Sequence, residues 1–159
     1  MSRDATFEEG REAPLNLGAM DGEDLKVISS LVQDAVFPIT EMRWRPAQRR
    51  FALLVNRFRW EDAEAARTRG RAFERVQSLL VVDQVLQVAS QGLDRGDPDL
   101  ILSLLAVDFE PGAEGAGHVL LTLAGDGAIR LSVEALEITL RDVTRPYVAP
   151  SRHVPEHPE

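Results

Sequence analysis

The residues best suited to chemistry lie in one stretch, EMRWRPAQRRFALLVNRFRWE, at positions 41–61. This stretch holds six arginines and four aromatic residues. Guanidinium groups pair with carboxylates or phosphates, and aromatic rings stack on bases, so the composition suits a protein partner or a single-stranded nucleic acid. The candidate partner-binding residues are therefore the six arginines, Arg43, Arg45, Arg49, Arg50, Arg57 and Arg59.

The spacing of this stretch favours a structural β-hairpin over a nucleic-acid platform. Apolar and arginine residues alternate on both sides of residues 46–49, which have the length of a hairpin connection. The hairpin places aromatic and arginine side chains on opposite faces, whereas a base-stacking platform needs both on one face. The predicted register pairs Arg45 with Arg50, Trp44 with Phe51 and Met42 with Leu53.

A second group of candidate ligands is the loop DRGDPD at residues 94–99. Its three aspartates, Asp94, Asp97 and Asp99, could offer oxygen ligands to a hard cation such as Ca²⁺. The EF-hand pattern is not met, and aspartate and glycine around a proline are also typical of a plain turn. We therefore predict no metal site.

Catalytic motifs are missing from the sequence. His153 and His157 lie in a proline-rich tail, and His118 opens an apolar run without an identifiable partner. No serine lies in a G-x-S-x-G elbow, and there is no phosphate-binding glycine loop. We predict no catalytic residue and no cofactor, so the chain is expected not to be an enzyme. The enzymatic alternative is a small hydrolase or ligand-binding protein with a site near residues 94–99 and His118.

The charge of the chain is unevenly placed along the sequence. Residues 1–42 hold three cations and nine anions (−6), residues 43–75 hold ten arginines and four anions (+6), and residues 76–159 hold five cations and thirteen anions (−8). Arginine pairs as readily with carboxylates as with phosphates. The clustered arginines are therefore expected to pair with Glu41 on the same face of the hairpin, with acidic residues of 76–159 or with an external anion.

The elements that position these residues are one helix followed by strands. Helical spacing over residues 21–36, with Asp21 as N-cap, predicts an amphipathic helix that Pro38 ends. Alternating or apolar runs predict further strands, and residues 61–68 could form a helical turn. Residues 134–143 fit a strand or a helix, and we favour a strand after a bend near Glu134. The predicted strands after the hairpin are 75–82, 84–93, 100–110, 118–123 and 128–133.

These elements predict one α+β domain, with the N-terminal amphipathic helix packed on a largely antiparallel β-sheet. The domain is expected to span residues 19–147, between a flexible acidic tail at 1–18 and a disordered proline-rich tail at 148–159. No apolar run approaches a membrane span, and the N-terminus has no signal-peptide pattern. Together with the absence of cysteine, this favours the cytoplasm and gives no indication of a membrane partner.

Three runs of the sequence resemble an uncharacterised protein family. RRFALLVNRFRWE, QGLDRGDPDLILSLLAVDFEPG and GDGAIRLSVEALEITLRDV occur in this order, and the likeness extends from Leu15 to Tyr147. They are similar to the domain of unknown function 2948 family of alphaproteobacteria. The resemblance implies a small bacterial protein and brings no catalytic motif with it.

Two functional hypotheses remain besides the enzymatic one. The first is a non-enzymatic protein-binding or adaptor module, because the segregated charge could steer an oppositely charged protein partner. The alternative is an RNA-binding protein that uses the arginine-rich segment 43–75 through eight of its ten arginines, Arg43, Arg45, Arg49, Arg50, Arg67, Arg69, Arg71 and Arg75. The oligomeric state is not predicted.

Overall fold

The computed structural model describes residues 14–70 and 72–148. Its α-helices are α2 (Gly22–Leu31) and α3 (Ala63–Thr68), and its 3-10 turns are η1 (Ile39–Glu41), η2 (Pro46–Gln48), η3 (Trp60–Asp62) and η4 (Ala113–Gly115). The strands are β1 (Asn16–Ala19), β2 (Ala35–Pro38), β3 (Met42–Arg45), β4 (Arg50–Phe58), β5 (Glu74–Val82), β6 (Val85–Gln91), β7 (Ile101–Pro111), β8 (Gly117–Leu123), β9 (Ala128–Val133), β10 (Ile138–Asp142) and β11 (Tyr147–Val148).

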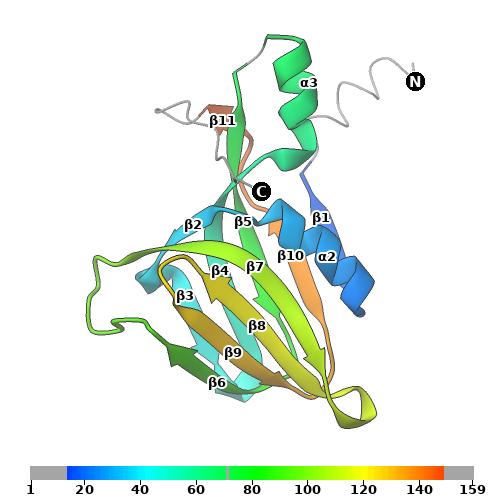
Figure 1. The fold of residues 1–159 in the computed structure, drawn as a ribbon, viewed down its shortest axis with the longest axis vertical. Helices are drawn as coiled ribbons and strands as arrows, with labels where there is room; N and C mark the ends of the chain where they lie inside the picture. Colours follow the sequence, from blue (N-terminus) through cyan, green and yellow to red (C-terminus); the bar gives the residue numbers. More distant parts are fainter. Residues whose placement is uncertain (1–13, 71, 149–159) are drawn as a thin grey trace.

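The strands form one antiparallel sheet in the order β1-β10-β5-β4-β2-β7-β8-β9-β6, with β3 paired to β4 and β11 to β5. β2 pairs with both β4 and β7 and so links two layers. β7, β8 and β9 cross in front of β3 and β4 (Figure 1). The inward side chains of both layers form a single apolar core, for example Phe51 and Leu80 with Leu121 and Ile129.

The α+β class predicted from the sequence is wrong, and the fold is closer to all-β. Strands take 51% of the described residues, and helical turns of all kinds take 21%. The two α-helices have ten and six residues and do not form a layer over the sheet. The physical reason is that the two layers of strands bury each other's apolar faces, so the sheet needs no helical layer to cover it.

Helix α2 begins as predicted but ends earlier. The Asp21 carboxylate accepts a hydrogen bond of 2.8 Å from the backbone N–H of Asp24, as an N-cap does. The helix ends at Leu31 rather than at Pro38. Asp34 adopts a left-handed conformation with φ 64°, and Ala35 then begins β2. Pairing of β2 with β7 therefore replaces the last predicted turn of helix.

The predicted hairpin is confirmed in its register. β3 and β4 pair Arg45 with Arg50, Trp44 with Phe51 and Met42 with Leu53. Arg49 closes the connection with a left-handed φ of 53°. Phe51 is buried, and Trp44 packs against the same core, so the aromatic face is the inner one.

The later elements also agree with the sequence. Residues 134–135 form a bend, and the segment after them is strand β10, which settles the ambiguity between strand and helix. β10 lies between β1 and β5. The predicted helical turn after the hairpin is present as η3 and α3, and Gly70 follows with φ 68°.

The boundary of the predicted N-terminal tail needs a correction. β1 begins at Asn16 and pairs along its length with β10, so residues 16–18 belong to the sheet. Residues 1–13, and residues 149–159 of the predicted C-terminal tail, lie outside the described residues. None of the helices that the structure describes is long and apolar enough to cross a bilayer.

Candidate functional site

The six candidate arginines divide into a buried and an exposed group. Arg57 is fully buried and Arg59 is 5% exposed. These two side chains are not available to a protein partner, so the structure removes them from the predicted binding set. The exposed arginines of the set are Arg43, Arg45, Arg49 and Arg50.

Arg57 is the centre of a buried ionic cluster. Its guanidinium donates two hydrogen bonds to the Glu61 carboxylate, at 2.9 and 2.8 Å, and one of 3.0 Å to Asp142 Oδ1. Arg57 Nε donates to Ser78 Oγ at 2.9 Å, and this hydroxyl donates to Asp142 at 2.6 Å. Asp142 Oδ2 also accepts the backbone N–H of Leu15 at 2.9 Å. The cluster therefore joins β4, β5 and β10 to the residue before β1.

Burial lowers the pKa of the Arg57 guanidinium. The hydrogen bonds and negative charges of Glu61 and Asp142 together raise it by more than burial lowers it, so the pKa lies above its ordinary value. A cation with a raised pKa contributes stability that is complete below its unfolded pKa and is lost only as the pH rises through the folded pKa. Arg57 thus stays charged far beyond neutral pH. Its neighbour Arg59 forms a second, partly buried ion pair, with Glu74 at 2.6 Å.

The exposed arginines make fewer contacts. Arg49 pairs with Glu134 at 2.8 Å, and Arg50 pairs with Asp83 at the same distance. Both carboxylates come from the acidic segment 76–159, one of the three sources of negative charge expected from the sequence. Arg43 Nη1 donates to the carbonyl of Thr40 at 2.7 Å. No described residue forms a hydrogen bond or ion pair with the Arg45 side chain.

The exposed arginines border an aliphatic patch on the outer face of the sheet. Val81 of β5 pairs with Ala52 of β4, and Leu79 pairs with Leu54. These four side chains have the strand parity opposite to the buried Phe51, so they point outward, and each is half-buried. Outer faces of antiparallel sheets are commonly polar, so four contiguous aliphatic side chains are unusual there.

Cross-strand pairing sets arginines around this patch. Arg43 lies beside Ala52, and Arg45 lies beside Arg50. On the other side, β10 places Arg141 beside Leu79. We call this surface the arginine-rimmed face, and define it as Ala52, Leu54, Leu79 and Val81 with Arg43, Arg45, Arg50 and Arg141.

A hollow of about 290 Å³ lies on the arginine-rimmed face. Leu79 and Val81 form its apolar floor, while Arg50 and Arg141 supply positive charge at its border. Its remaining lining residues are Asn16, Asp83 and Thr139. A second hollow, of about 450 Å³, lies between the start of α2 and β7, and its charged lining residues are Asp21, Glu23, Asp108 and Lys26.

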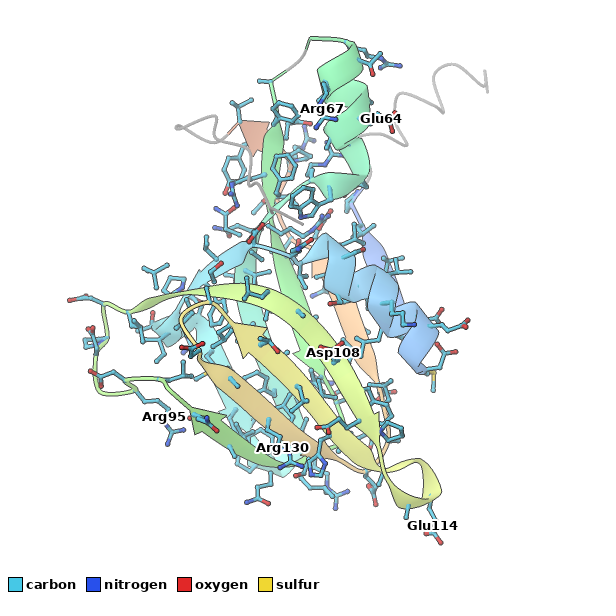
Figure 2. All side chains as sticks on the ribbon, in the orientation of Figure 1. Glu64, Arg67, Arg95, Asp108, Glu114 and Arg130 are labelled. Atoms are coloured by element: carbon cyan, nitrogen blue, oxygen red, sulfur yellow. The ribbon has the colours of Figure 1, made fainter. Side chains whose placement is uncertain are left out.

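The arginines of the RNA hypothesis are not brought to one surface. Arg50 begins β4, whereas Arg75 pairs with Phe58 at the other end of the strand, eight residues and roughly 26 Å further along. Arg67 lies on α3, which projects beyond the two layers of strands at one end of the molecule (Figure 1 and Figure 2). Arg71 lies outside the described residues.

The proposed hydrolase residues are also separated. His118 pairs with Glu110 near the end of β7, whereas the loop of residues 94–99 precedes the start of the same strand. Nine residues of strand place them roughly 30 Å apart. The His118 ring instead lies 3.3 Å from the Arg130 guanidinium of β9. The loop and His118 do not form a common active site.

The carboxylates of the 94–99 loop act within turns. Asp94 Oδ1 accepts the backbone N–H of Gly96 at 3.1 Å, and Asp97 Oδ1 accepts that of Asp99 at 3.0 Å. These are the local bonds that aspartates make in turns. Within residues 14–70 and 72–148, no three histidine, aspartate or glutamate side chains lie close enough to hold a metal ion.

Sequence reasoning missed Arg141 and the aliphatic half of the arginine-rimmed face. A signal was present in β5, where the run Leu79-Leu80-Val81-Val82 is apolar at both strand parities. One parity suffices for the core, so the other predicts an apolar outer face. Arg141 had no such signal, because its position beside Leu79 depends on pairing between distant strands.

Comparison with known protein families gives a match to the chain. The family model described as "Protein of unknown function (DUF2948)" matches residues 15–157, which is nearly the whole chain. The chain belongs to the DUF2948 family. This confirms the resemblance seen in the sequence, and the family description assigns no activity. No curated protein and no solved structure gives a significant match.

Proposed function

We propose that this DUF2948 protein is a cytoplasmic, non-enzymatic module that binds another protein through the arginine-rimmed face. The observation that carries the proposal is the contiguous aliphatic patch of Ala52, Leu54, Leu79 and Val81 within a border of exposed arginines. Exposed apolar patches with polar borders are typical of protein–protein interaction sites.

The chemistry of the face specifies the partner. Burial of the aliphatic patch would contribute about 25 cal/mol per Å² of apolar surface removed from water. The arginines would steer and orient carboxylates, because guanidinium binds them in a bidentate manner. The partner is therefore a protein surface that combines apolar side chains with aspartate or glutamate.

The arrangement of the aromatic rings supports a protein partner over RNA. A single-strand nucleic-acid platform needs aromatic rings beside the cations. Here Trp44 and Phe51 pack toward the core, and aliphatic side chains occupy the outer positions between the arginines. Aliphatic side chains bury apolar protein surface well but give bases no ring to stack on.

An affinity capture from native lysate tests the proposal with paired variants. Arg43→Ala with Arg45→Ala removes part of the border, and Leu54→Gln with Leu79→Gln makes the patch polar. Both double variants should lose the captured protein, whereas Arg130→Ala, an exposed arginine on the other layer, should retain it. Changes at exposed positions normally alter the free energy of unfolding by less than about 0.5 kcal/mol, so the arginine variant should unfold like the wild type.

Two results would contradict this function. One is capture that disappears when the lysate is treated with nuclease, which would favour the RNA alternative. The other is a partner that both double variants retain at wild-type levels. Binding of the purified partner should also weaken as salt is added, because the arginine contribution is screened.

A further inference from the structure

Four of the described strands, β1, β3, β6 and β11, have an edge without a β-partner. Three of these edges are protected. β1, β3 and β11 are only two to four residues long. In addition, β3 carries Arg43 and Arg45, and α2 contacts β1. Short length, charged side chains and a covering helix are the devices by which proteins keep strand edges from pairing with another chain.

β6 has none of these three protections. It is seven residues long, contains no charged residue and ends the path of the sheet (Figure 1). Leu86 is 52% exposed. A bulge between Val85 and Gln87, and a bond of 2.9 Å from the Val85 N–H to the Arg49 carbonyl, occupy the start of the strand. The five residues from Gln87 onward remain as a regular open edge.

We propose that this edge pairs antiparallel with β6 of a second copy of the chain, about a two-fold axis at Ala89. The five regular residues are centred on Ala89, so Gln87 of each copy lies opposite Gln91 of the other. The exposed side chains on one face of the joined sheet are then glutamine amides, which can hydrogen-bond to each other, and small alanines. Such a contact uses the same surface on both copies and closes at the dimer.

The charge distribution makes β6 an edge at which a second copy can approach. The chain has a formal net charge of −8, so two copies repel each other over most of their surfaces. β6 contributes nothing to that charge. The nearest cation on the neighbouring strand is Arg130, opposite Ala89. In the dimer the two Arg130 positions are three strand spacings apart, roughly 14 Å, which exceeds the Debye length at physiological salt.

The size of the contact predicts a weak dimer. Stable protein–protein interfaces bury about 1,600 Å² in total. One pair of five-residue strands buries less, so backbone hydrogen bonds contribute most of the affinity. The association should therefore depend on protein concentration.

Sedimentation equilibrium of the full chain over a concentration series tests the dimer and its register. The wild type should rise from 17.6 kDa toward twice that mass. Gln87→Lys with Gln91→Lys places cations opposite each other across the axis and should stay monomeric. Gln87→Lys with Gln91→Glu places each lysine opposite a glutamate and should restore the dimer. Thr122→Lys, exposed on β8 away from the edge, should dimerise like the wild type.

The proposal is overturned by a wild type that stays at 17.6 kDa up to its solubility limit. It is equally overturned by a lysine–lysine variant that dimerises as well as the wild type, or by a lysine–glutamate variant that remains monomeric. Far-UV circular dichroism of each variant checks the fold, and an identical spectrum for the two double variants makes their difference in mass specific to strand pairing.

Discussion

Replacing Arg57 with methionine should cost far more stability than replacing any exposed arginine of the hairpin. Methionine keeps much of the apolar volume of the arginine stem but removes its charge and donors. The Asp142 side chain is 5% exposed and would lose its ionic partner, while Glu61, at 30%, could turn toward water. The penalty therefore comes chiefly from one buried, uncompensated carboxylate.

The magnitude follows from what remains around that carboxylate. Breaking a buried ion pair by removing one partner costs about 3–5 kcal/mol. Asp142 keeps the Ser78 hydroxyl and the Leu15 backbone N–H as donors, which places the loss near the lower end, at about 3 kcal/mol. For a domain of this size, such a loss lowers the Tm by about 6–12 °C.

Urea unfolding followed by circular dichroism measures this loss directly. Arg50→Met is the matched control, because it breaks one ion pair whose side chains are 52% and 22% exposed. An exposed pair of this kind contributes about 0–1 kcal/mol. Adding Asp142→Asn to Arg57→Met should recover part of the loss, since the orphaned charge is then removed. If Arg57→Met and Arg50→Met differ by less than about 1 kcal/mol, the reasoning about the buried cluster is refuted.

Two further substitutions test the packing, both by urea unfolding. Gly117→Ala should lower the free energy of unfolding by about 1–3 kcal/mol, because the added Cβ would lie 2.3 Å from the Glu110 carbonyl oxygen. Gly22→Ala meets no atom within 4 Å and should raise stability by about 0.4–1 kcal/mol, so equal effects at the two glycines would count against this explanation. Trp60→Phe should cost about 0.5–1.5 kcal/mol through loss of the 3.0 Å bond from the indole N–H to the Gln33 carbonyl, and an unchanged midpoint would contradict that role.

The parts of the fold that could be predicted are those with a local signal. Alternation between Trp44 and Phe51 across a four-residue connection was enough to predict the register of the hairpin. The fold class has no such local signal in the sequence. It depended on whether helices or a second layer of strands cover the sheet, and the sequence order of the elements does not contain that information.

Arg57 is among the partner-binding residues predicted from the sequence, although the alternation along β4 places its side chain inside. Its strand parity is that of Phe51 and Val55, which are buried, so alternation alone places it inside. Arginine is almost never fully buried without a partner, so alternation alone does not predict the burial of an arginine. One partner, Glu61, is four residues further along the chain, but the buried partner is Asp142, 85 residues away, and only the fold brings Arg57 and Asp142 together.

The pairing of the first strand with β10 has a consequence for synthesis on the ribosome. Leu15 and Asp142 are bonded across 127 residues, so β1 leaves the exit tunnel long before its neighbour exists. At roughly 5–20 residues per second, the nascent N-terminal segment waits on the order of 6–25 seconds for that strand. During this interval β5 has no β10 beside it, and Arg57 has no Asp142. The last third of translation therefore completes both the sheet and its buried charge balance, and a truncation there should release a chain prone to aggregate.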